Sequence, residues 1–195
     1  MKRLFDIFCS FVILILFLPF GILIAIFVFF DSRGGVFYVQ ERIGKDQKPF
    51  GLIKFRTMFV NSENEGKLTI GMNDYRITRI GRFLRRTKLD EFPQFLNVLI
   101  GDMSIVGPRP EIPEYVALYS EQQRIILGYK PGITDVASLE YYRENEILGA
   151  SEDPQKKYIE EIMPAKIELN KQYIKNASMG QDIKIMCRTV LKMFA

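Results

Sequence analysis

Residues 14–24 read LILFLPFGILI and lie at the centre of an apolar run that carries no charged side chain from residue 7 to residue 30. About 20 apolar residues in a helix cover the roughly 30 Å hydrocarbon core of a bilayer, so the run predicts a membrane segment. A cleaved signal peptide is the competing interpretation, but the run is longer than a signal sequence and has no small-residue cleavage site before Asp31. We therefore expect the segment to stay attached.

Pro19 divides this run into two halves, residues 7–18 and 20–30. A proline inside a helix removes one backbone hydrogen bond and costs about 3 kcal/mol unless the helix kinks around it. Each half is about 17 Å long, roughly half the thickness of the hydrocarbon core. A chain that turns at Pro19, helped by Gly21, therefore enters and leaves the bilayer by the same face as a re-entrant hairpin.

The charges that flank the run give an independent indication of topology. Lys2 and Arg3 precede it, and residues 32–90 hold 13 Lys and Arg against 6 Asp and Glu. The positive-inside rule then places both ends in the cytoplasm, which a single span would violate. A spanning helix with a tolerated kink remains the alternative, because proline is common in membrane helices, and the physics of the residues favours neither.

Residues 32–195 are enough for one domain with a core of its own, so we predict a membrane-embedded segment 1–31 and one cytoplasmic-face domain. The net charge is +4, but residues 91–195 hold 12 basic against 15 acidic residues, so the basic character follows the membrane run. A basic segment beside a membrane indicates binding to anionic lipid headgroups or to a phosphorylated substrate. Histidine is absent, which excludes His-based triads and most zinc hydrolase sites, and the distant Cys9 and Cys187 fit a reducing compartment.

The domain is predicted to be α+β and mainly helical. Alternating β-branched and aromatic residues predict a β-hairpin of residues 36–44 and 50–58, followed by a polar loop over residues 59–75. Helical spacing from residue 77 to 86 places Ile80, Phe83 and Leu84 on one face and arginines around the other. Such a helix suits a membrane surface, although a solvated basic face is the commoner explanation.

Residues 87–101, TKLDEFPQFLNVLIG, predict the next helix, with Thr87 as N-cap, Asp90 as its capping-box acid and Gly101 at the end. Residues 102–113 contain three prolines and predict an ordered loop. Two more helices are expected at residues 152–176, interrupted near Pro164, and at residues 182–194. The last has an apolar face that either packs on the domain, which we favour, or lies on the bilayer: Ile183, Met186, Cys187, Val190, Leu191 and Phe194.

Asp90 and Glu91 are adjacent carboxylates with cationic residues just upstream, so both should be anionic at neutral pH. Anionic carboxylates can hold Mg²⁺, and one of them can act as a nucleophile. An isolated Asp-Glu pair is more often a helix cap with surface salt bridges. Lys54, Arg56 and Arg109 are likewise ordinary when taken singly, although a proline-stiffened VGPRP loop can aim Arg109 at a phosphate through two hydrogen bonds.

Three motifs in this order form a recognisable pattern: KFRTM (54–58), the block GRFLRRTKLDEFPQFLNVLIGDMSIVGPRP (81–110) and KPGIT (130–134). After an apolar N-terminal hairpin they resemble the bacterial sugar transferases, also called monotopic phosphoglycosyl transferases, in their minimal catalytic form. The resemblance implies transfer of a sugar 1-phosphate from a UDP-sugar to undecaprenyl phosphate, with release of UMP and a covalent aspartyl intermediate. It also implies that the protein is located in the bacterial inner membrane with its active site on the cytoplasmic face. The reaction would then be the first step in the assembly of a capsule, an exopolysaccharide or a glycoconjugate.

The resemblance also assigns roles to individual residues. Asp90 matches the nucleophilic aspartate, and Glu91 matches the glutamate associated with Mg²⁺. The resemblance implies that both carboxylates lie at the metal ion. Pro19 matches the helix-breaking proline, which favours the re-entrant topology. The side chains expected to bind phosphates or the nucleotide, and the prolines expected to shape their loop, are Lys54, Arg56 and Arg109, and Pro108 and Pro110.

Two positions depart from the family's pattern. Leu18 stands where a small polar residue often precedes the proline, and residues 135–148, DVASLEYYRENEIL, replace a continuation that usually begins with glycine. The second departure lies in a region expected to tune the donor sugar. The role of Asp102, in structure or in the site, and a homo-oligomeric state stay open.

Two other classes of protein compete with the enzyme. A non-enzymatic membrane-anchored scaffold or basic-surface binding protein would explain the anchor and the basic face, but it leaves the clustered motifs without a purpose. A membrane-tethered nucleic-acid binder would use the basic segment, but the sequence contains no recognised binding module, so we expect no nucleic-acid partner.

Overall fold

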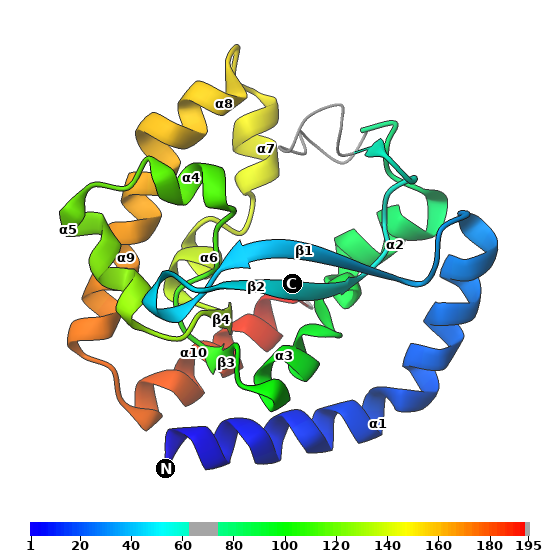
Figure 1. The fold of residues 1–195 in the computed structure, drawn as a ribbon, viewed down its shortest axis with the longest axis horizontal. Coiled ribbons are helices and arrows are strands. Elements are labelled where there is room, and N and C mark those ends of the chain that lie inside the picture. Colours follow the sequence, from blue (N-terminus) through cyan, green and yellow to red (C-terminus); the bar gives the residue numbers. More distant parts are fainter. Residues whose placement is uncertain (63–73, 194–195) are drawn as a thin grey trace.

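The N-terminal apolar run forms one long helix, α1 (Lys2–Asp31), in the computed structural model, which describes residues 1–62 and 74–193. The prediction of two helices separated at Pro19 is wrong in this respect, because Pro19 lies inside a single helix. Figure 1 shows that α1 bends part-way along its length. A bend is what an interior proline imposes, since its ring displaces the preceding turn without ending the helix.

Both halves of α1 contact the remainder of the chain. In the first half Asp6 is buried, and its carboxylate accepts hydrogen bonds from Ser104 Oγ at 2.8 Å and Ile105 N at 3.4 Å. At the other end Asp31 Oδ2 accepts a hydrogen bond from Ile80 N at 2.8 Å. The rest of the surface of α1 is largely exposed and apolar. Among the described residues α1 alone is long and apolar enough to cross a bilayer.

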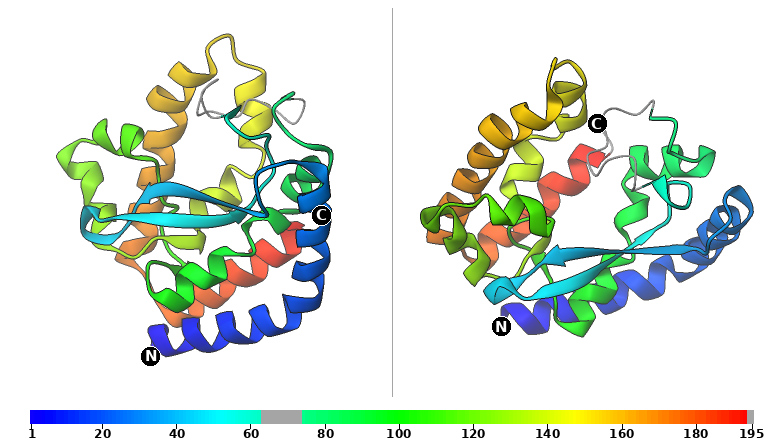
Figure 2. Two further views of the ribbon diagram at one scale, coloured as in Figure 1. Left: turned by 45° about the vertical axis from the view of Figure 1, so that its right-hand side comes forward. Right: turned by 45° about the horizontal axis from the view of Figure 1, so that its top comes forward.

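The predicted hairpin is confirmed. Strands β1 (Phe37–Ile43) and β2 (Pro49–Phe55) pair antiparallel, from Phe37 opposite Phe55 to Ile43 opposite Pro49. A helical turn, η1 (Lys45–Gln47), joins them. Figures 1 and 2 show the hairpin crossing the middle of the molecule, with α1 on one side and α9 (Met163–Lys175) on the other. Most of the predicted loop 59–75 lies outside the described residues.

Helix α2 (Arg79–Thr87) follows, and the Oγ1 of its N-cap Thr78 accepts a hydrogen bond from Gly81 N at 2.9 Å. The predicted apolar face is only partly right, because Leu84 is buried whereas Phe83 is 57% exposed. The prediction of Thr87 as an N-cap is wrong. Thr87 is the last residue of α2, and its hydroxyl donates to Phe83 O at 2.9 Å.

The chain reverses after Thr87 because Lys88 adopts a left-handed conformation, with φ 58°. Asp90 therefore does not serve as a capping-box acid in the first turn of an α-helix. It lies in a short 3₁₀ turn, η3 (Leu89–Glu91), before α3 (Gln94–Ile100). Gly101 ends α3 with φ 112°, as predicted.

The second half of the chain packs helices around a short parallel pair of strands, β3 (Ser104–Val106) and β4 (Gly132–Thr134). A π-helical turn, η5 (Tyr158–Ile162), precedes α9 close to Pro164, where an interruption was predicted. The remaining elements are α4 (Pro113–Ala117), α5 (Glu121–Arg124), η4 (Ile125–Gly128), α6 (Val136–Glu140), α7 (Glu144–Gly149), α8 (Pro154–Lys157) and α10 (Met179–Met193).

The last helix, α10, packs on the domain as favoured, but through a face that shares only part of the predicted one: Met186 packs against the core, and Phe194 lies outside the described residues. Asp182 and Ile185 are its buried residues. On the predicted face, Ile183, Val190 and Leu191 are exposed by 44%, 54% and 71%. The packing contact and the exposed apolar face therefore lie on different sides of the same helix.

Candidate active site

A large cavity of about 1130 Å³ opens between the hairpin, the turn η3 and the helices of the second half. Sites for small ligands typically measure about 300–1000 Å³, so this cavity has room for more than one small group. All five charged residues singled out in the sequence line it: Lys54, Arg56, Asp90, Glu91 and Arg109. Pro19 and Asp102 are not among its lining residues.

The left-handed residue Lys88 turns the chain so that Asp90 points into this cavity from η3. Asp90 is 8% exposed, and no hydrogen bond or ion pair reaches its carboxylate from the parts of the chain that the structure describes. Burial raises the pKa of Asp90 above its ordinary value, and the negative charge of Glu91 raises it further. The positive charges of Lys54 and Arg85 act in the opposite direction.

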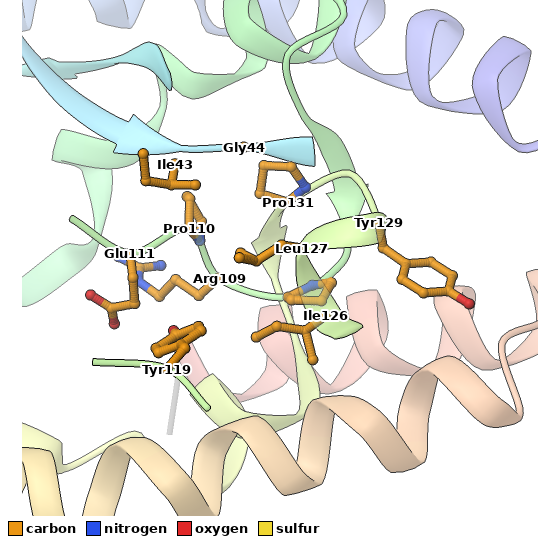
Figure 3. Close-up of a pocket in the computed structure, with 11 residues that line it drawn as sticks. Ile43, Gly44, Arg109, Pro110, Glu111, Tyr119, Ile126, Leu127, Tyr129 and Pro131 are labelled. Carbon is orange, nitrogen blue, oxygen red and sulfur yellow. The ribbon is translucent and has the colours of Figure 1, made fainter. Parts of the chain in front are cut away.

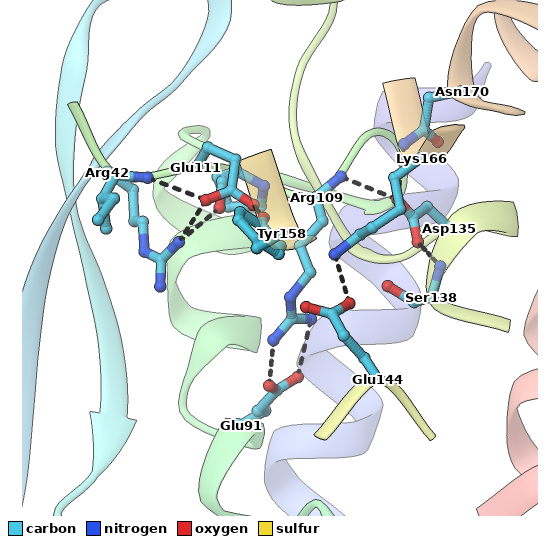
Figure 4. A network of polar contacts seen from close by, with 12 residues as sticks. Arg42, Glu91, Arg109, Glu111, Asp135, Ser138, Glu144, Tyr158, Lys166 and Asn170 are labelled. Carbon is cyan, nitrogen blue, oxygen red and sulfur yellow. Dashed lines mark hydrogen bonds and ion pairs between the residues drawn. The ribbon is translucent and has the colours of Figure 1, made fainter. Parts of the chain in front are cut away.

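Glu91 is held by Arg109 from the loop after β3. Both nitrogens of the guanidinium fork donate to its carboxylate, Nη1 to Oε2 at 3.3 Å and Nη2 to Oε1 (Figure 4). Burial opposes ionisation of Glu91, but the charges of Arg109 and Lys54 outweigh it and hold its pKa below the ordinary range. The negative charge of Glu91 in turn raises the pKa of Arg109.

Lys54 and Arg56 reach the cavity from the end of β2. Burial lowers the pKa of Lys54 to about 8, although Glu91 opposes the shift. Arg56 donates to Phe37 O at 3.3 Å and packs over Gly34, where a Cβ atom would lie 2.1 Å from Arg56 Nη1. Because Gly34 also has φ +118°, glycine suits that position on both grounds.

Arg109 stands in a tightly connected loop between Pro108 and Pro110. Gly107 N donates to Thr134 O at 3.1 Å, and Gly132 N donates to Pro108 O at 3.0 Å, so the loop is joined to β4. Figure 3 shows the small neighbouring pocket beneath this loop, lined by Pro110 and by apolar residues of the α5–β4 region. The two prolines thus lie beside the large cavity rather than in it.

The sequence interpretation missed a second set of polar residues on the same cavity wall. Arg85, assigned to the outer face of α2, lines the cavity, and its Nε donates to Thr57 Oγ1 at 2.9 Å. Glu111 accepts a hydrogen bond from Tyr158 and lies 3.5 Å from Arg42 (Figure 4). No local motif marks these contacts, because their partners are far apart in the sequence.

The donor set is compatible with a magnesium ion that is completed by a substrate. Mg²⁺ is usually bound by one or two carboxylates together with water and phosphate oxygens. Asp90 offers a carboxylate at the cavity wall that has no partner within residues 1–62 and 74–193, whereas both oxygens of Glu91 accept hydrogen bonds from Arg109. Residues 1–62 and 74–193 contain no cluster of three acidic or cysteine ligands that could hold a metal ion without a substrate.

Comparison with known sequences gives a consistent group of relatives. A family model described as bacterial sugar transferase matches residues 1–195. The UDP-glucose:undecaprenyl-phosphate glucose-1-phosphate transferase of Klebsiella pneumoniae is 41% identical over 99% of this chain and 40% of its own length. The UDP-N-acetylgalactosamine-undecaprenyl-phosphate N-acetylgalactosaminephosphotransferase of Aeromonas hydrophila is 34% identical over 97% of this chain and 42% of its own length.

A shorter relative, the exopolysaccharide production protein ExoY of Rhizobium meliloti, is 32% identical over 97% of this chain and 83% of its own length. This chain therefore spans about 40% of the first two relatives but most of the third.

Proposed function

We propose that this chain, which belongs to the bacterial sugar transferase family, transfers a sugar 1-phosphate from a UDP-sugar to undecaprenyl phosphate and releases UMP. One observation carries the proposal beyond family membership. The cavity wall holds a buried carboxylate, Asp90, that no described residue binds, beside the cations of Lys54 and Arg85. A nucleophile next to groups that neutralise phosphate charge is what a phosphoryl transfer needs.

In the proposed first half-reaction an oxygen of Asp90 attacks the β-phosphorus of the donor. The bond from that phosphorus to the oxygen bridging the α-phosphorus breaks, and UMP leaves with the electron pair. The poorly solvated carboxylate of Asp90 is more basic than an exposed one, which favours attack. Lys54 and Arg85 stabilise the charge that develops on the departing phosphate.

In the second half-reaction a phosphate oxygen of undecaprenyl phosphate attacks the phosphorus of the acyl phosphate. The bond from that phosphorus to the Asp90 oxygen breaks, and Asp90 leaves as a carboxylate. Arg109 uses only about two of the four lone pairs of the Glu91 carboxylate, so Mg²⁺ held by Asp90 and Glu91 would supply charge neutralisation to the bound diphosphate. Apolar residues of α1 and α10, Ile13, Phe17, Met186 and Val190, also line the cavity. They give the polyprenyl acceptor an apolar approach to a polar centre.

The experiment that tests this function measures UMP release by the full chain in lipid nanodiscs, with undecaprenyl phosphate, Mg²⁺ and a panel of UDP-sugars. The relatives are named for glucose and for N-acetylgalactosamine, so both donors belong in the panel. Release of UMP that depends on donor and Mg²⁺ supports the proposal. A scaffold or a nucleic-acid binder would release none with any donor.

Lys54 gives the proposed enzyme a pH dependence. Its pKa of about 8 means that the ammonium is charged below that pH and becomes neutral above it. We expect kcat/KM for the donor to fall as pH rises above about 8, because neutral Lys54 no longer attracts phosphate. Lys54→Arg keeps its charge throughout, so its profile should lose this alkaline limb. A limb that persists in the variant would assign the titration to another group.

We also propose that residues 1–31 form a re-entrant segment and that both of its ends lie on the cytoplasmic face, where the catalytic domain of residues 32–195 sits. Two sets of contacts support this topology. Near the N-terminus Lys2 pairs with Asp182, and Arg3 donates to Leu99 O at 3.0 Å. At the other end Asp31 bonds to Ile80 N at 2.8 Å, so both ends of α1 are held by one polar domain.

The exposed surfaces beside α1 suit a membrane surface as well. α10 presents exposed Ile183, Val190 and Leu191, and α2 presents exposed Phe83 together with exposed Arg82 and Arg86. Apolar residues next to arginines are typical of helices that lie in the interface plane. We therefore propose that these two faces rest on the bilayer while the polar end of the cavity opens toward the cytoplasm.

Cysteine labelling tests the topology. In a background with Cys9→Ser and Cys187→Ser, we expect a cysteine placed before Met1 and one at Lys45 to react with an impermeant reagent from the same side of the membrane. Pro19→Leu should shift part of the population toward a span, because the bend loses its main local cause. Phe20→Leu, which keeps the proline, is the matched control. Labelling of the two sites from opposite sides in the unmodified helix would contradict the proposal.

A further inference from the structure

Asp135 directly follows the KPGIT motif, and the structure gives its side chain several contacts. It is 1% exposed. Its Oδ1 accepts a hydrogen bond from Ser138 N at 2.6 Å, at the start of α6. Its Oδ2 accepts two more, from Arg109 N at 3.1 Å and from Asn170 Nδ2 at 2.9 Å (Figure 4).

The contact with Arg109 matters because the loop has few backbone N–H groups through which it can be anchored. Between Gly107 and Pro110 only Gly107 and Arg109 have a backbone N–H, since proline has none. The N–H of Gly107 goes to Thr134 O at 3.1 Å, and the N–H of Arg109 goes to Asp135. The carboxylate thus anchors the backbone from which the guanidinium fork reaches Glu91.

We propose that Asp135 is a positioning residue: through the main chain of Arg109 it fixes the guanidinium fork on Glu91, next to the nucleophile Asp90. This inference rests on the proposed function and assigns Asp135 no contact with the substrate. A site whose groups must be held within about 0.5 Å of a productive geometry depends on such supporting bonds.

The alternative is that Asp135 is simply the N-cap of α6, and the two oxygens separate these roles. A cap needs one acceptor, and Oδ1 supplies it to Ser138 N. The bond to Arg109 uses Oδ2 and is not needed for capping. Asn and Ser cap helices about as well as Asp, so a variant can keep the cap and lose the second oxygen.

The chemistry at Oδ2 also explains why a carboxylate stands here. Both of its partners are N–H donors, so an asparagine whose Oδ1 still caps α6 would turn its own NH₂ group toward Arg109 N and Asn170 Nδ2. Turning the amide of Asn170 would present its Oδ1, which has no partner among the described residues, to that NH₂ group, but it would still give Arg109 N no acceptor.

The test compares Asp135→Asn and Asp135→Ser with the unchanged chain in nanodiscs. Thermal unfolding checks the fold, hydrogen exchange of the peptide spanning residues 107–111 checks the anchor, and UMP release checks the consequence. We expect exchange to accelerate about tenfold and kcat for UMP release to fall about 10- to 100-fold, in a protein that still folds and whose unfolding temperature is about 3–6 °C lower. Asp153→Asn, which alters the exposed N-cap of α8, is the matched control and should change neither.

A double-mutant cycle separates action through Arg109 from general damage. In the Arg109→Lys background, Asp135→Asn should cause a much smaller further loss than it does alone, because the fork that it positions is already gone. Losses that multiply fully, or unchanged exchange of residues 107–111, would overturn the inference. If the unchanged chain releases no UMP from any donor, the proposed function fails, whereas the exchange result still decides whether Asp135 anchors the loop.

Discussion

Asp90→Asn should reduce the release of UMP by at least about 1000-fold while the protein stays folded. The substitution removes the attacking charge but keeps the shape of the side chain. It breaks no hydrogen bond among the described residues, because none reaches the Asp90 carboxylate. Burial raises the pKa of Asp90, so the ionised form is disfavoured in the folded state. Removal of that charge should therefore leave the unfolding temperature equal or slightly higher at neutral pH.

The covalent intermediate can be tested in the same preparation. With UDP-sugar and Mg²⁺ but no acceptor, the unchanged chain should release about one equivalent of UMP and gain the mass of one sugar phosphate on the peptide that contains Asp90. Added undecaprenyl phosphate should discharge the adduct. The Asp90→Asn variant should show neither the burst nor the mass gain. A direct transfer within a ternary complex predicts no adduct, and an adduct elsewhere would move the nucleophile to another residue.

Glu91→Gln should be measured beside Asp90→Asn, because the two carboxylates are proposed to have different roles. It should also reduce the rate severely, because the loss of charge weakens the proposed magnesium site, and excess Mg²⁺ should restore part of the rate. No metal concentration should rescue Asp90→Asn. Equal responses of the two variants to Mg²⁺ would show that the adjacent carboxylates share one role.

Arg109→Lys is expected to lower kcat/KM by about 100-fold although the charge is retained. The planar guanidinium fork places one nitrogen on each oxygen of Glu91, and a single ammonium cannot reproduce both bonds. The side chain of Glu91 is only 14% exposed, so water cannot readily replace the hydrogen bond that the substitution removes.

Arg124→Lys is the matched control for this substitution. Arg124 is half-buried, its side chain makes one hydrogen bond to the described residues, to Gln47 Oε1 at 2.9 Å, and it does not line the cavity. Its replacement should leave the kinetics within about twofold of the unchanged chain. Near-normal rates for Arg109→Lys itself would reduce the GPRP loop to a structural role.

Local signals predicted the hairpin, the end of α3 at Gly101 and the interruption near Pro164, because each depends on neighbouring residues. The prediction that Thr87 begins the next helix was wrong because neighbouring residues do not decide that boundary. Threonine is acceptable both as an N-cap and in the last turn of a helix, and a lysine in left-handed conformation is uncommon, so the reversal at Lys88 has no sequence signal.

The candidate site was predictable as far as its motifs extend. The five charged residues that were proposed as substrate-binding or catalytic from the sequence do line one cavity. They could be predicted because each lies in a recognisable motif. Glu111, Asp135 and Arg85 were missed because their roles depend on partners from distant segments. The packing face of α10 was missed for a similar reason: Asp182 is buried because Tyr173 and Lys2 bond to it, and an apolar stripe cannot tell a protein core from a bilayer.

The polar contacts at the two ends of α1 also set an order of events during synthesis. Asp31 and Ile80 are 49 residues apart, and Lys2 and Asp182 are 180 residues apart. At about 5–20 residues per second, the first partner is made about 2–10 s after Asp31 and the second about 9–36 s after Lys2. The apolar helix is therefore synthesised before either partner exists, and during that interval its orientation depends on Pro19 and on the charged residues that have already been made. The contacts with the folded domain can preserve that orientation afterwards, but they come too late to choose it.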